Sequence, residues 1–341
     1  MTKYFVTGGA GFIGANYVLR MLDPERAGEP IEKMTVVDAL TYAGNFESLA
    51  PVKDDPRLTF VKADIRDEAA MEKAMAEADP EFVVHFAAES HVDRSISGPR
   101  AFIETNVLGT QILLDVAKKQ GVKRFLHVST DEVYGSLGPD GYFTESSPIK
   151  PSSPYSSSKA SSDLVALSYH HTFGMDVVVT RCSNNYGPLQ FPEKLIPLMI
   201  INALNDQPLP VYGDGMQVRD WIHVWDHNEA VQRVLHNGRA GEVYNIGSHN
   251  EKPNIEIVKR ILGHLGKPES LIKHVTDRLG HDRRYAIDPT KMRDELGWSP
   301  QQTFEEGIAS TIQWYLDNQT WWERVRSGAY RDYYEKQYAN R

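Results

Sequence analysis

The chain has 341 residues, enough for one large domain or two of ordinary size. Hydrophobic residues make up 41% and charged residues 24%, a composition typical of packed globular proteins. The formal net charge of −9 argues against nucleic acid or an anionic membrane surface as the main partner. Cys182 is the only cysteine, which excludes an intrachain disulfide and a cysteine-rich zinc site.

The N-terminal stretch MTKYFVTGGAGFIG enters an apolar strand at once and lacks the long apolar core of a secretory signal. No uninterrupted apolar stretch in the sequence approaches the roughly 20 residues that span a bilayer. We therefore expect a cytoplasmic protein with neither a membrane nor a nucleic acid as partner.

Short apolar strands alternate with helical patterns through the first half of the chain. The expected strands cover residues 3–7, 34–37, 58–61, 82–86, 125–129 and 176–180. The expected helices cover residues 12–22, 68–78, 101–119 and 159–173. This alternation predicts an α/β fold with a Rossmann-type doubly wound parallel sheet. Ligands of such sheets lie outside the carboxyl ends of the strands.

The pattern becomes irregular and rich in proline after Tyr186. We expect a first domain over residues 1–186 and a smaller C-terminal substrate-binding lobe over residues 187–341. Within the second part, a helix over 222–235 and a strand over 243–246 are expected to return to the first domain. The aromatic residues of the tail are expected to pack on the body; they are Trp321, Trp322, Tyr330, Tyr333 and Tyr334.

The stretch TGGAGFIG follows the first expected strand and opens the first expected helix. Its glycines allow a tight turn and let backbone N–H groups approach a pyrophosphate at the helix N-terminus. Asp38 ends the second strand 24 residues beyond Gly14, where a carboxylate binds an adenosine ribose and repels a 2′-phosphate. The sequence therefore predicts an NAD-binding domain. The predicted cofactor-binding residues are Gly8, Gly11, Phe12, Ile13, Gly14, Asp38, Asp64, Ile65 and Ala87, together with Tyr155 and Lys159 discussed next.

Tyr155 and Lys159 stand four residues apart, so they share one face of the helix that they open. A lysine ammonium and an oxidised nicotinamide both lower the pKa of a nearby phenol from about 10. Such a tyrosine can take a proton from a hydroxyl while hydride leaves the same carbon. YxxxK is common on exposed helices, but its position in a dinucleotide fold favours a catalytic pair.

The segment FLHVSTDEVYG places a hydroxyl and two carboxylates at the end of an apolar strand: Thr130, Asp131 and Glu132. A polar loop would be the simplest explanation of adjacent acids. However, close carboxylates push one pKa upward, which suits a pair that works as one general acid and one general base. The adjacent acids alone do not decide between a polar loop and a catalytic pair.

TGGAGFIG, FAAES and YxxxK resemble, in this order, the extended short-chain dehydrogenase/reductase family, which acts mainly on nucleotide sugars. The segments STDEVYG, AESHVDRS, NNYGP, PEKLIP and GHDRRY are similar to the branch of that family that dehydrates dTDP-glucose. These matches run from Gly8 to Tyr285, most of the chain.

The resemblance implies a redox-neutral hydro-lyase with tightly held NAD and the product dTDP-4-keto-6-deoxyglucose. Tyr155 would deprotonate the sugar 4-hydroxyl, with Thr130 hydrogen-bonded to the same oxygen, while NAD takes a hydride from C4. Glu132 would remove the C5 proton and Asp131 would protonate the departing 6-hydroxyl, before the hydride returns to C6. The alternatives are an epimerase, a 4,6-dehydratase of another nucleotide sugar, and a non-catalytic NAD-sensing protein.

The segment DRLGHDRRY carries Arg278, Arg283 and Arg284, and arginine forks suit phosphate oxygens. Arg219 is a further candidate. The resemblance implies a nucleotide-sugar site lined by Ser90, Thr130, Asn185, Lys194, Leu195, Pro210, Tyr212, Arg219, Asn254, Arg278, His281 and Tyr285. It also implies a homodimer built by the helices at 101–119 and 159–173.

His223 and His227 stand four apart, but no third ligand is obvious and the intervening residues do not form a metalloprotease motif. We predict no metal.

Overall fold

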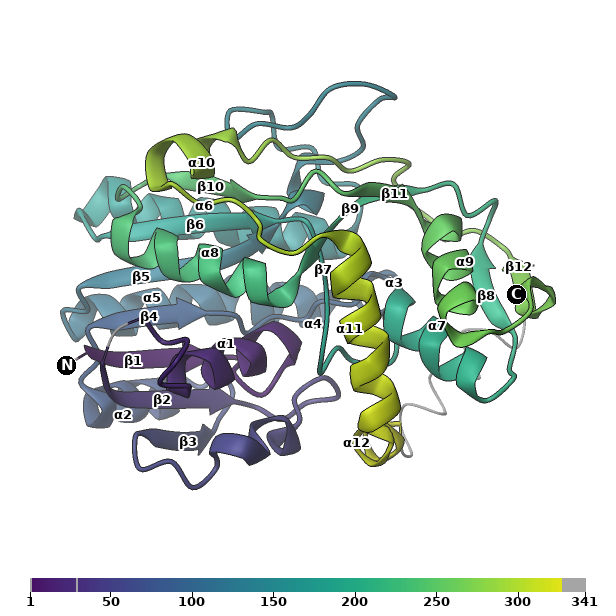
Figure 1. Cartoon of the computed structure of the whole chain (residues 1–341). Coiled ribbons are helices and arrows are strands. Elements are labelled where there is room, and N and C mark those ends of the chain that lie inside the picture. Colours follow the sequence, from purple (N-terminus) through teal and green to yellow (C-terminus); the bar gives the residue numbers. More distant parts are fainter. Residues whose placement is uncertain (1, 29, 327–341) are drawn as a thin grey trace.

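The computed structural model describes residues 2–28 and 30–326 (Figure 1). Its centre is a seven-stranded sheet in the order β10-β6-β5-β4-β1-β2-β3, and every neighbouring pair runs parallel. The strands are β1 (Thr2–Thr7), β2 (Ile31–Asp38), β3 (Leu58–Lys62), β4 (Phe82–His85), β5 (Arg124–Thr130), β6 (Val177–Cys182) and β10 (Val243–Ile246). This order contains the 3-2-1-4-5-6 arrangement of Rossmann folds, so the predicted fold class is confirmed.

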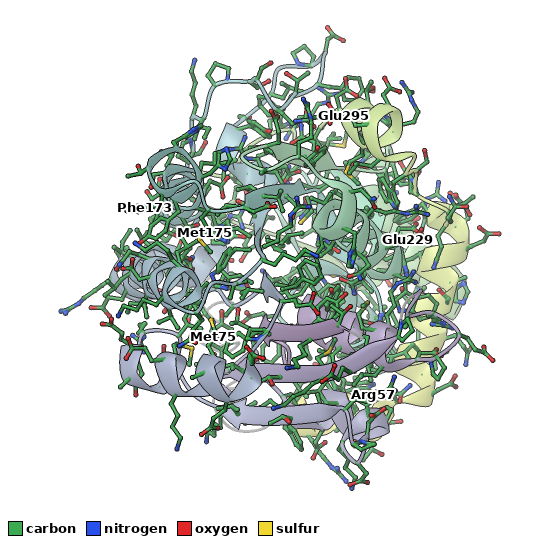
Figure 2. All side chains as sticks on the ribbon, turned by 90° about the vertical axis from the view of Figure 1, so that its left-hand side faces the viewer. Arg57, Met75, Phe173, Met175, Glu229 and Glu295 are labelled. Carbon is green, nitrogen blue, oxygen red and sulfur yellow. The ribbon has the colours of Figure 1, made fainter. Side chains whose placement is uncertain are left out.

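Consecutive strand residues point to opposite faces, and helices cover both. Phe5 packs in one layer and Val6 in the other, and Val83 and Val84 divide in the same way. One layer is formed by α1 (Phe12–Leu22) and α8 (Val224–Asn237), and the other by α2 (Glu68–Ala78), α5 (Thr110–Lys119) and α6 (Pro154–Phe173). Figure 2 shows side chains filling these layers, with Met75 and Met175 in the second one.

The smaller lobe lies beside the carboxyl ends of the large sheet (Figure 1). It contains a sheet of β7 (Asn184–Tyr186), β9 (Val218–His223) and β11 (Glu251–Pro253), and the pair β8 (Leu209–Tyr212) and β12 (Ile272–Val275). Its helices are α7 (Leu195–Leu204), α9 (Asn254–Leu265), α11 (Phe304–Asp317) and α12 (Gln319–Val325). The remaining short elements are η1 (Phe46–Val52), α3 (Val92–Ser97), η4 (Glu269–Leu271) and α10 (Thr290–Leu296).

Three expected helices differ from the structure. The helix expected over 159–173 begins earlier, at Pro154 of α6. The helix expected over 101–119 is three segments: α4 (Pro99–Phe102), the π-helical η2 (Ile103–Gly109) and α5. The helix expected over 222–235 begins later, because Ile222 and His223 end β9. His223 caps α8 instead, with its Nδ1 accepting a hydrogen bond from the Trp225 N–H at 3.3 Å. The strand expected over 243–246 is β10, which extends the large sheet beside β6.

The aromatic tail is described only as far as residue 326. Trp322 is buried and donates its indole N–H to the Tyr315 carbonyl at 2.9 Å. Tyr330, Tyr333 and Tyr334 lie outside the described residues. Over residues 2–28 and 30–326, every helix is too short or too polar to cross a membrane.

Candidate active site

The glycine turn after β1 forms the floor of a cleft at the carboxyl edge of the sheet. Gly8 has a φ of +71°, and a Cβ there would lie 2.6 Å from the Ala87 nitrogen. A Cβ on Gly14 would collide with the Gly8 carbonyl oxygen. Both positions therefore require glycine, and the space that they leave lies at the N-terminus of α1, where a pyrophosphate is favoured.

Asp38 lines this cleft beside the glycine turn. It is buried at the end of β2 and accepts hydrogen bonds from the N–H groups of Ala10 (3.0 Å) and Leu40 (2.8 Å). Its carboxylate oxygens each keep a second lone pair that can accept a ribose hydroxyl. The cleft has a volume of about 370 Å³, and all of the predicted cofactor-binding residues line it. The site therefore fits a dinucleotide.

A second cavity of about 160 Å³ adjoins this cleft on the side of the smaller lobe. The two cavities share Glu132 and Lys194. Three predicted substrate-binding residues line only the first cleft: Ser90, Thr130 and Asn185. The others line the second cavity: Lys194, Leu195, Pro210, Tyr212, Arg219, Asn254, Arg278, His281 and Tyr285. The structure thus brings all twelve residues to one continuous site.

The acid pair lies at the junction of the two cavities. β5 ends at Thr130, and Asp131–Tyr134 form one 3-10 turn, η3, in which neighbouring side chains do not alternate as they do in a strand. The Thr130 hydroxyl caps this turn by accepting from the Glu132 N–H at 3.2 Å. It also donates to Asp131 Oδ1 at 3.3 Å. Both carboxyl groups therefore line the same cleft.

The two acids differ in their electrostatic surroundings. Burial raises the pKa of Asp131 well above its usual range, and the neighbouring Glu132 carboxylate raises it further. Its buried Oδ2 has no hydrogen-bond partner among the described residues. Burial also raises the pKa of Glu132, but three cations act against this: Arg278, Arg219 and Lys194. Asp131 is consequently the better proton donor, and Glu132 is the acid more easily kept ionised.

Tyr155 and Lys159 lie on the first turns of α6, which begins with Pro154 after a Ser153–Ser156 capping box. The Lys159 ammonium donates to the Val128 carbonyl at 2.8 Å. Burial, followed by the charge of Glu132, raises the pKa of Tyr155 well above 10 in the chain by itself. The lowering of that pKa by Lys159 stays a prediction. The positive charge of an oxidised nicotinamide would also lower it.

Two arginines point into the substrate cavity and two do not. Arg219 is buried, with its guanidinium 4.2 Å from the Tyr285 ring centre, and Arg278 has a buried Nε without a partner among the described groups. Arg283 instead pairs with Asp214 at 2.8 Å, and Arg284 donates to the Gly141 carbonyl at 2.9 Å. The expectation that Arg283 and Arg284 bind phosphate is therefore wrong.

The sequence analysis missed several residues of the site. Glu89 and Glu193 line the cleft, although the FAAES and PEKLIP segments contained them. Asn106, from the π-helical η2, donates to the Ser158 hydroxyl at 2.8 Å and to the Glu89 carbonyl at 3.0 Å. It thereby connects the end of β4 to the helix that carries Tyr155. π-Helical segments occur frequently at functional sites, but the sequence carries no clear signal for one here.

His223 and His227 are both buried, and burial lowers their pKa values to about 4 and about 3. Across the part of the chain that the structure describes, no three histidine, cysteine or acidic side chains group as metal ligands.

Comparison with known proteins agrees with this geometry. The family model described as GDP-mannose 4,6 dehydratase matches residues 5–311. A dTDP-glucose 4,6-dehydratase of Xanthomonas campestris pv. campestris (strain B100) is 54% identical, covering 97% of this chain and 98% of that protein. The structure of the dTDP-glucose 4,6-dehydratase DesIV from Streptomyces venezuelae, solved with NAD bound, gives a TM-score of 0.92 at 52% identity, covering 94% of this chain and 99% of that chain.

A UDP-glucose 4-epimerase from Thermus thermophilus, in complex with NAD, is less similar. Its TM-score is 0.84 at 30% identity, covering 92% of this chain and 99% of that chain. The epimerase thus shares the fold at a much lower sequence identity than the dehydratases do. This agrees with the motifs around the acid pair, which are similar to those of the dehydratases. The chain belongs to the dTDP-glucose 4,6-dehydratase family, within the extended short-chain dehydrogenases/reductases.

Proposed function

We propose that the protein catalyses the NAD-dependent dehydration of dTDP-glucose to dTDP-4-keto-6-deoxyglucose. The observation that carries this proposal is the pair Asp131 and Glu132, which lie side by side in the cleft. Burial raises the pKa of both acids; the Glu132 carboxylate raises that of Asp131 further, whereas three cations act against the rise for Glu132. An elimination of water needs one group that removes a proton and another that supplies one. The family membership and the NAD-bound relatives support the same reaction.

The glycine turn and Asp38 would hold the NAD, with Ile65 and Asp64 near the adenine. Bound NAD would supply a reversible hydride acceptor for C4 and C6 of the sugar, so the overall reaction would be redox-neutral. Arg219, Arg278 and Lys194 provide cationic groups for the diphosphate in the second cavity. The cofactor and the sugar would then meet at the junction of the two cavities.

The roles of the chain's own residues follow from this placement. Tyr155 and Thr130 would flank the sugar 4-oxygen, and Tyr155 would take its proton. The 4-ketone makes the C5 hydrogen acidic, so Glu132 can remove it. Asp131 would give its proton to the 6-oxygen, which leaves as water. Glu132 would return its proton to C5 as C6 receives the hydride. The proton that Tyr155 took from the 4-hydroxyl would pass to Asp131, which restores all three residues for the next turnover.

The decisive experiment incubates purified protein with dTDP-glucose and no added reductant, and follows the sugar by mass spectrometry. We expect the loss of one water without accumulation of NADH. An unchanged mass with an inverted stereocentre would indicate an epimerase. No reaction with dTDP-glucose or other nucleotide sugars, even with added NAD, would favour a binding protein.

We also propose a homodimer, a cytoplasmic location and the two-part organisation. A row of apolar side chains on η2 and α6 supports the dimer: Ile103, Leu108 and Leu164 are 50%, 48% and 58% exposed. The position of α8 and β10 supports an NAD-binding part that combines residues 1–186 with residues 224–246. The substrate lobe would then comprise the rest of the second half.

A further inference from the structure

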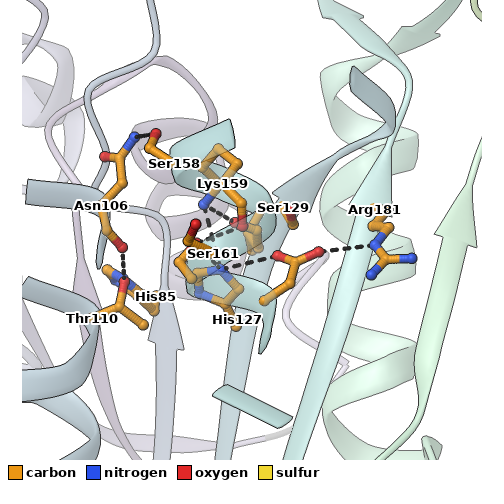
Figure 3. Close-up of polar contacts among 12 residues, drawn as sticks. His85, Asn106, Thr110, His127, Ser129, Ser158, Lys159, Ser161 and Arg181 are labelled. Atoms are coloured by element: carbon orange, nitrogen blue, oxygen red, sulfur yellow. Dashed lines mark hydrogen bonds and ion pairs between the residues drawn. The ribbon is translucent and has the colours of Figure 1, made fainter. Parts of the chain in front are cut away.

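A chain of buried charged side chains lies behind Lys159 (Figure 3). The Lys159 Nζ is 3.5 Å from Nε2 of His127, and the same nitrogen of His127 is 3.4 Å from Oδ1 of Asp163. The other carboxylate oxygen, Oδ2, accepts a hydrogen bond from Arg181 Nε at 2.9 Å. His127 and Asp163 are fully buried, and Arg181 is 2% exposed.

The spacing in α6 explains part of this arrangement. Asp163 follows Lys159 by four residues, as Lys159 follows Tyr155, so the three side chains share one face of the helix. The ion pair is also tied to the turn that carries the acids, because Arg181 donates to the Tyr134 hydroxyl at 3.0 Å. Tyr134 in turn donates to Asn245 of β10 at 2.8 Å. Burying an ion pair costs desolvation free energy, so a pair with this many partners suggests a functional role.

Two of the described residues raise the pKa of the Lys159 ammonium against the effect of burial, Asp163 first and Cys182 second. The titratable groups around the ammonium come from four elements: His85 of β4, His127 of β5, Tyr155 and Asp163 of α6, and Arg181 and Cys182 of β6. Burial lowers the pKa of His127 to about 4 and that of His85 well below 6.5, so both are neutral near pH 7. Burial raises the pKa values of Cys182 and Tyr155, so these are neutral too.

We propose that Asp163 is a positioning residue for proton transfer, which together with Arg181 sets how firmly Lys159 holds its positive charge beside Tyr155. This inference rests on the proposed roles of Tyr155 and Lys159. Burial lowers the pKa of Lys159 to about 8, while the Asp163 carboxylate raises it, so the ammonium is close to losing its proton at physiological pH. Arg181 partly neutralises the Asp163 carboxylate and so limits how far that carboxylate raises the pKa of Lys159.

The two members of the ion pair should therefore act in opposite directions. Asp163→Asn removes the negative charge, and we expect the pKa of Lys159 to fall by about one unit. Arg181→Gln leaves the Asp163 charge unshared, and we expect the pKa of Lys159 to rise. The alkaline limb of the pH profile of kcat should move with it, to lower pH in the first variant and to higher pH in the second.

The direct measurement is an NMR titration of protein with ¹³C-labelled lysine, in which Lys159→Arg identifies the Lys159 signal. Tyr134→Phe is the matched control: it removes a hydrogen bond from Arg181 but no charge, so the Lys159 titration should not move. A purely structural role would shift both charge variants in the same direction, or neither, and would overturn the proposal. Because the titration needs no turnover, opposite shifts in a protein that does not dehydrate dTDP-glucose would contradict the proposed function while upholding the charge-setting role.

Thermal melting shows whether each variant folds. Where a single variant does not, the double variant Asp163→Asn/Arg181→Gln removes both members of the ion pair, so neither is left buried without the other. It should lower the pKa of Lys159 by less than Asp163→Asn alone. An unchanged or raised pKa in the double variant would also overturn the proposal.

Discussion

Asp131 and Glu132 are consecutive residues whose pKa values are both raised by burial, but different neighbouring charges act on each carboxyl group. Asp131 is 1% exposed, and the adjacent Glu132 carboxylate opposes its ionisation. Glu132 faces the cations of the substrate lobe, which favour its ionised form. This difference arises from residues that are far apart in the sequence. The sequence therefore predicted an acid–base pair, and the structure supplies the reason for assigning the role of proton donor to Asp131.

Replacing each acid separately should stop the reaction at different steps. With Glu132→Gln, C4 should still be oxidised, which single-turnover absorbance would detect as NADH, but C5 should not exchange with D₂O. With Asp131→Asn, C5 exchange should persist while water loss falls by about 100-fold or more. The exposed Asp140→Asn, in the loop that follows, serves as the control and should react normally. If both acid variants kept near-normal turnover, or both retained C5 exchange, the assigned roles would be wrong.

The raised pKa of Asp131 also predicts a cost in stability. A carboxyl with a raised pKa binds its proton more tightly in the folded state, so stability falls as pH rises above the unfolded pKa of about 4 and through the folded pKa. Asn cannot ionise, and Asp131→Asn should therefore melt about 1–3 °C higher than the native protein at pH 8. The gain should shrink toward pH 5. Melting curves at the two pH values test this, and a gain that grows toward acid would contradict it.

At the scale of elements, the start of α6 determines where Tyr155 lies. The Ser153 hydroxyl accepts a hydrogen bond from the Ser156 N–H at 3.1 Å. The Ser156 hydroxyl in turn accepts a hydrogen bond from the Ser153 N–H at 3.0 Å. Ser153→Ala should cost about 1 kcal/mol of stability. It should also lower kcat severalfold with little change in KM, because the first turn carries the phenol.

A second capping box provides the matched control for this variant. Thr303 and Glu306 cap α11 in the same way, away from both cavities. Thr303→Ala should lower the melting temperature by a similar amount and leave kcat unchanged. Equal losses of kcat in the two variants would show that the α6 cap acts only through general stability.

The elements that the sequence did not predict are those fixed by distant contacts. The segment VRDWIH reads poorly as a strand because Arg219 and Asp220 interrupt its apolar residues. In the structure Asp220 is fully buried in β9 and accepts hydrogen bonds from the Ser248 and Asn250 N–H groups. Those partners come from the loop between β10 and β11, and no local pattern reveals them. By contrast, the amphipathic α2 and the buried β1 follow from local periodicity, and both were predicted closely.

At the scale of the molecule, the site forms where the strand order reverses, between β1 and β4. The glycine turn, Asp38 and the acid pair all end strands of one parallel sheet, so the sequence was sufficient to place them together. The pairing of Arg283 with Asp214 could not be predicted, since it depends on how the 277–285 segment lies against the smaller lobe. The same holds for the ion pair behind Lys159, which joins α6 to β6.

The exposed apolar side chains of η2 and α6 predict where two copies of the chain meet in a homodimer. Because a π-helical turn closes on the fifth residue, Ile103 and Leu108 lie on one side of η2, which packs against α6. Leu164 is a further exposed apolar side chain, on α6, and a second copy of the chain that covered these side chains would remove them from water. Leu164→Lys should shift the protein from dimer to monomer in analytical ultracentrifugation at micromolar concentration. Leu316→Lys, on α11, replaces a leucine that is 41% exposed and should not change the sedimentation. A native protein that sediments as a monomer, or a dimer that survives Leu164→Lys, would place the interface elsewhere.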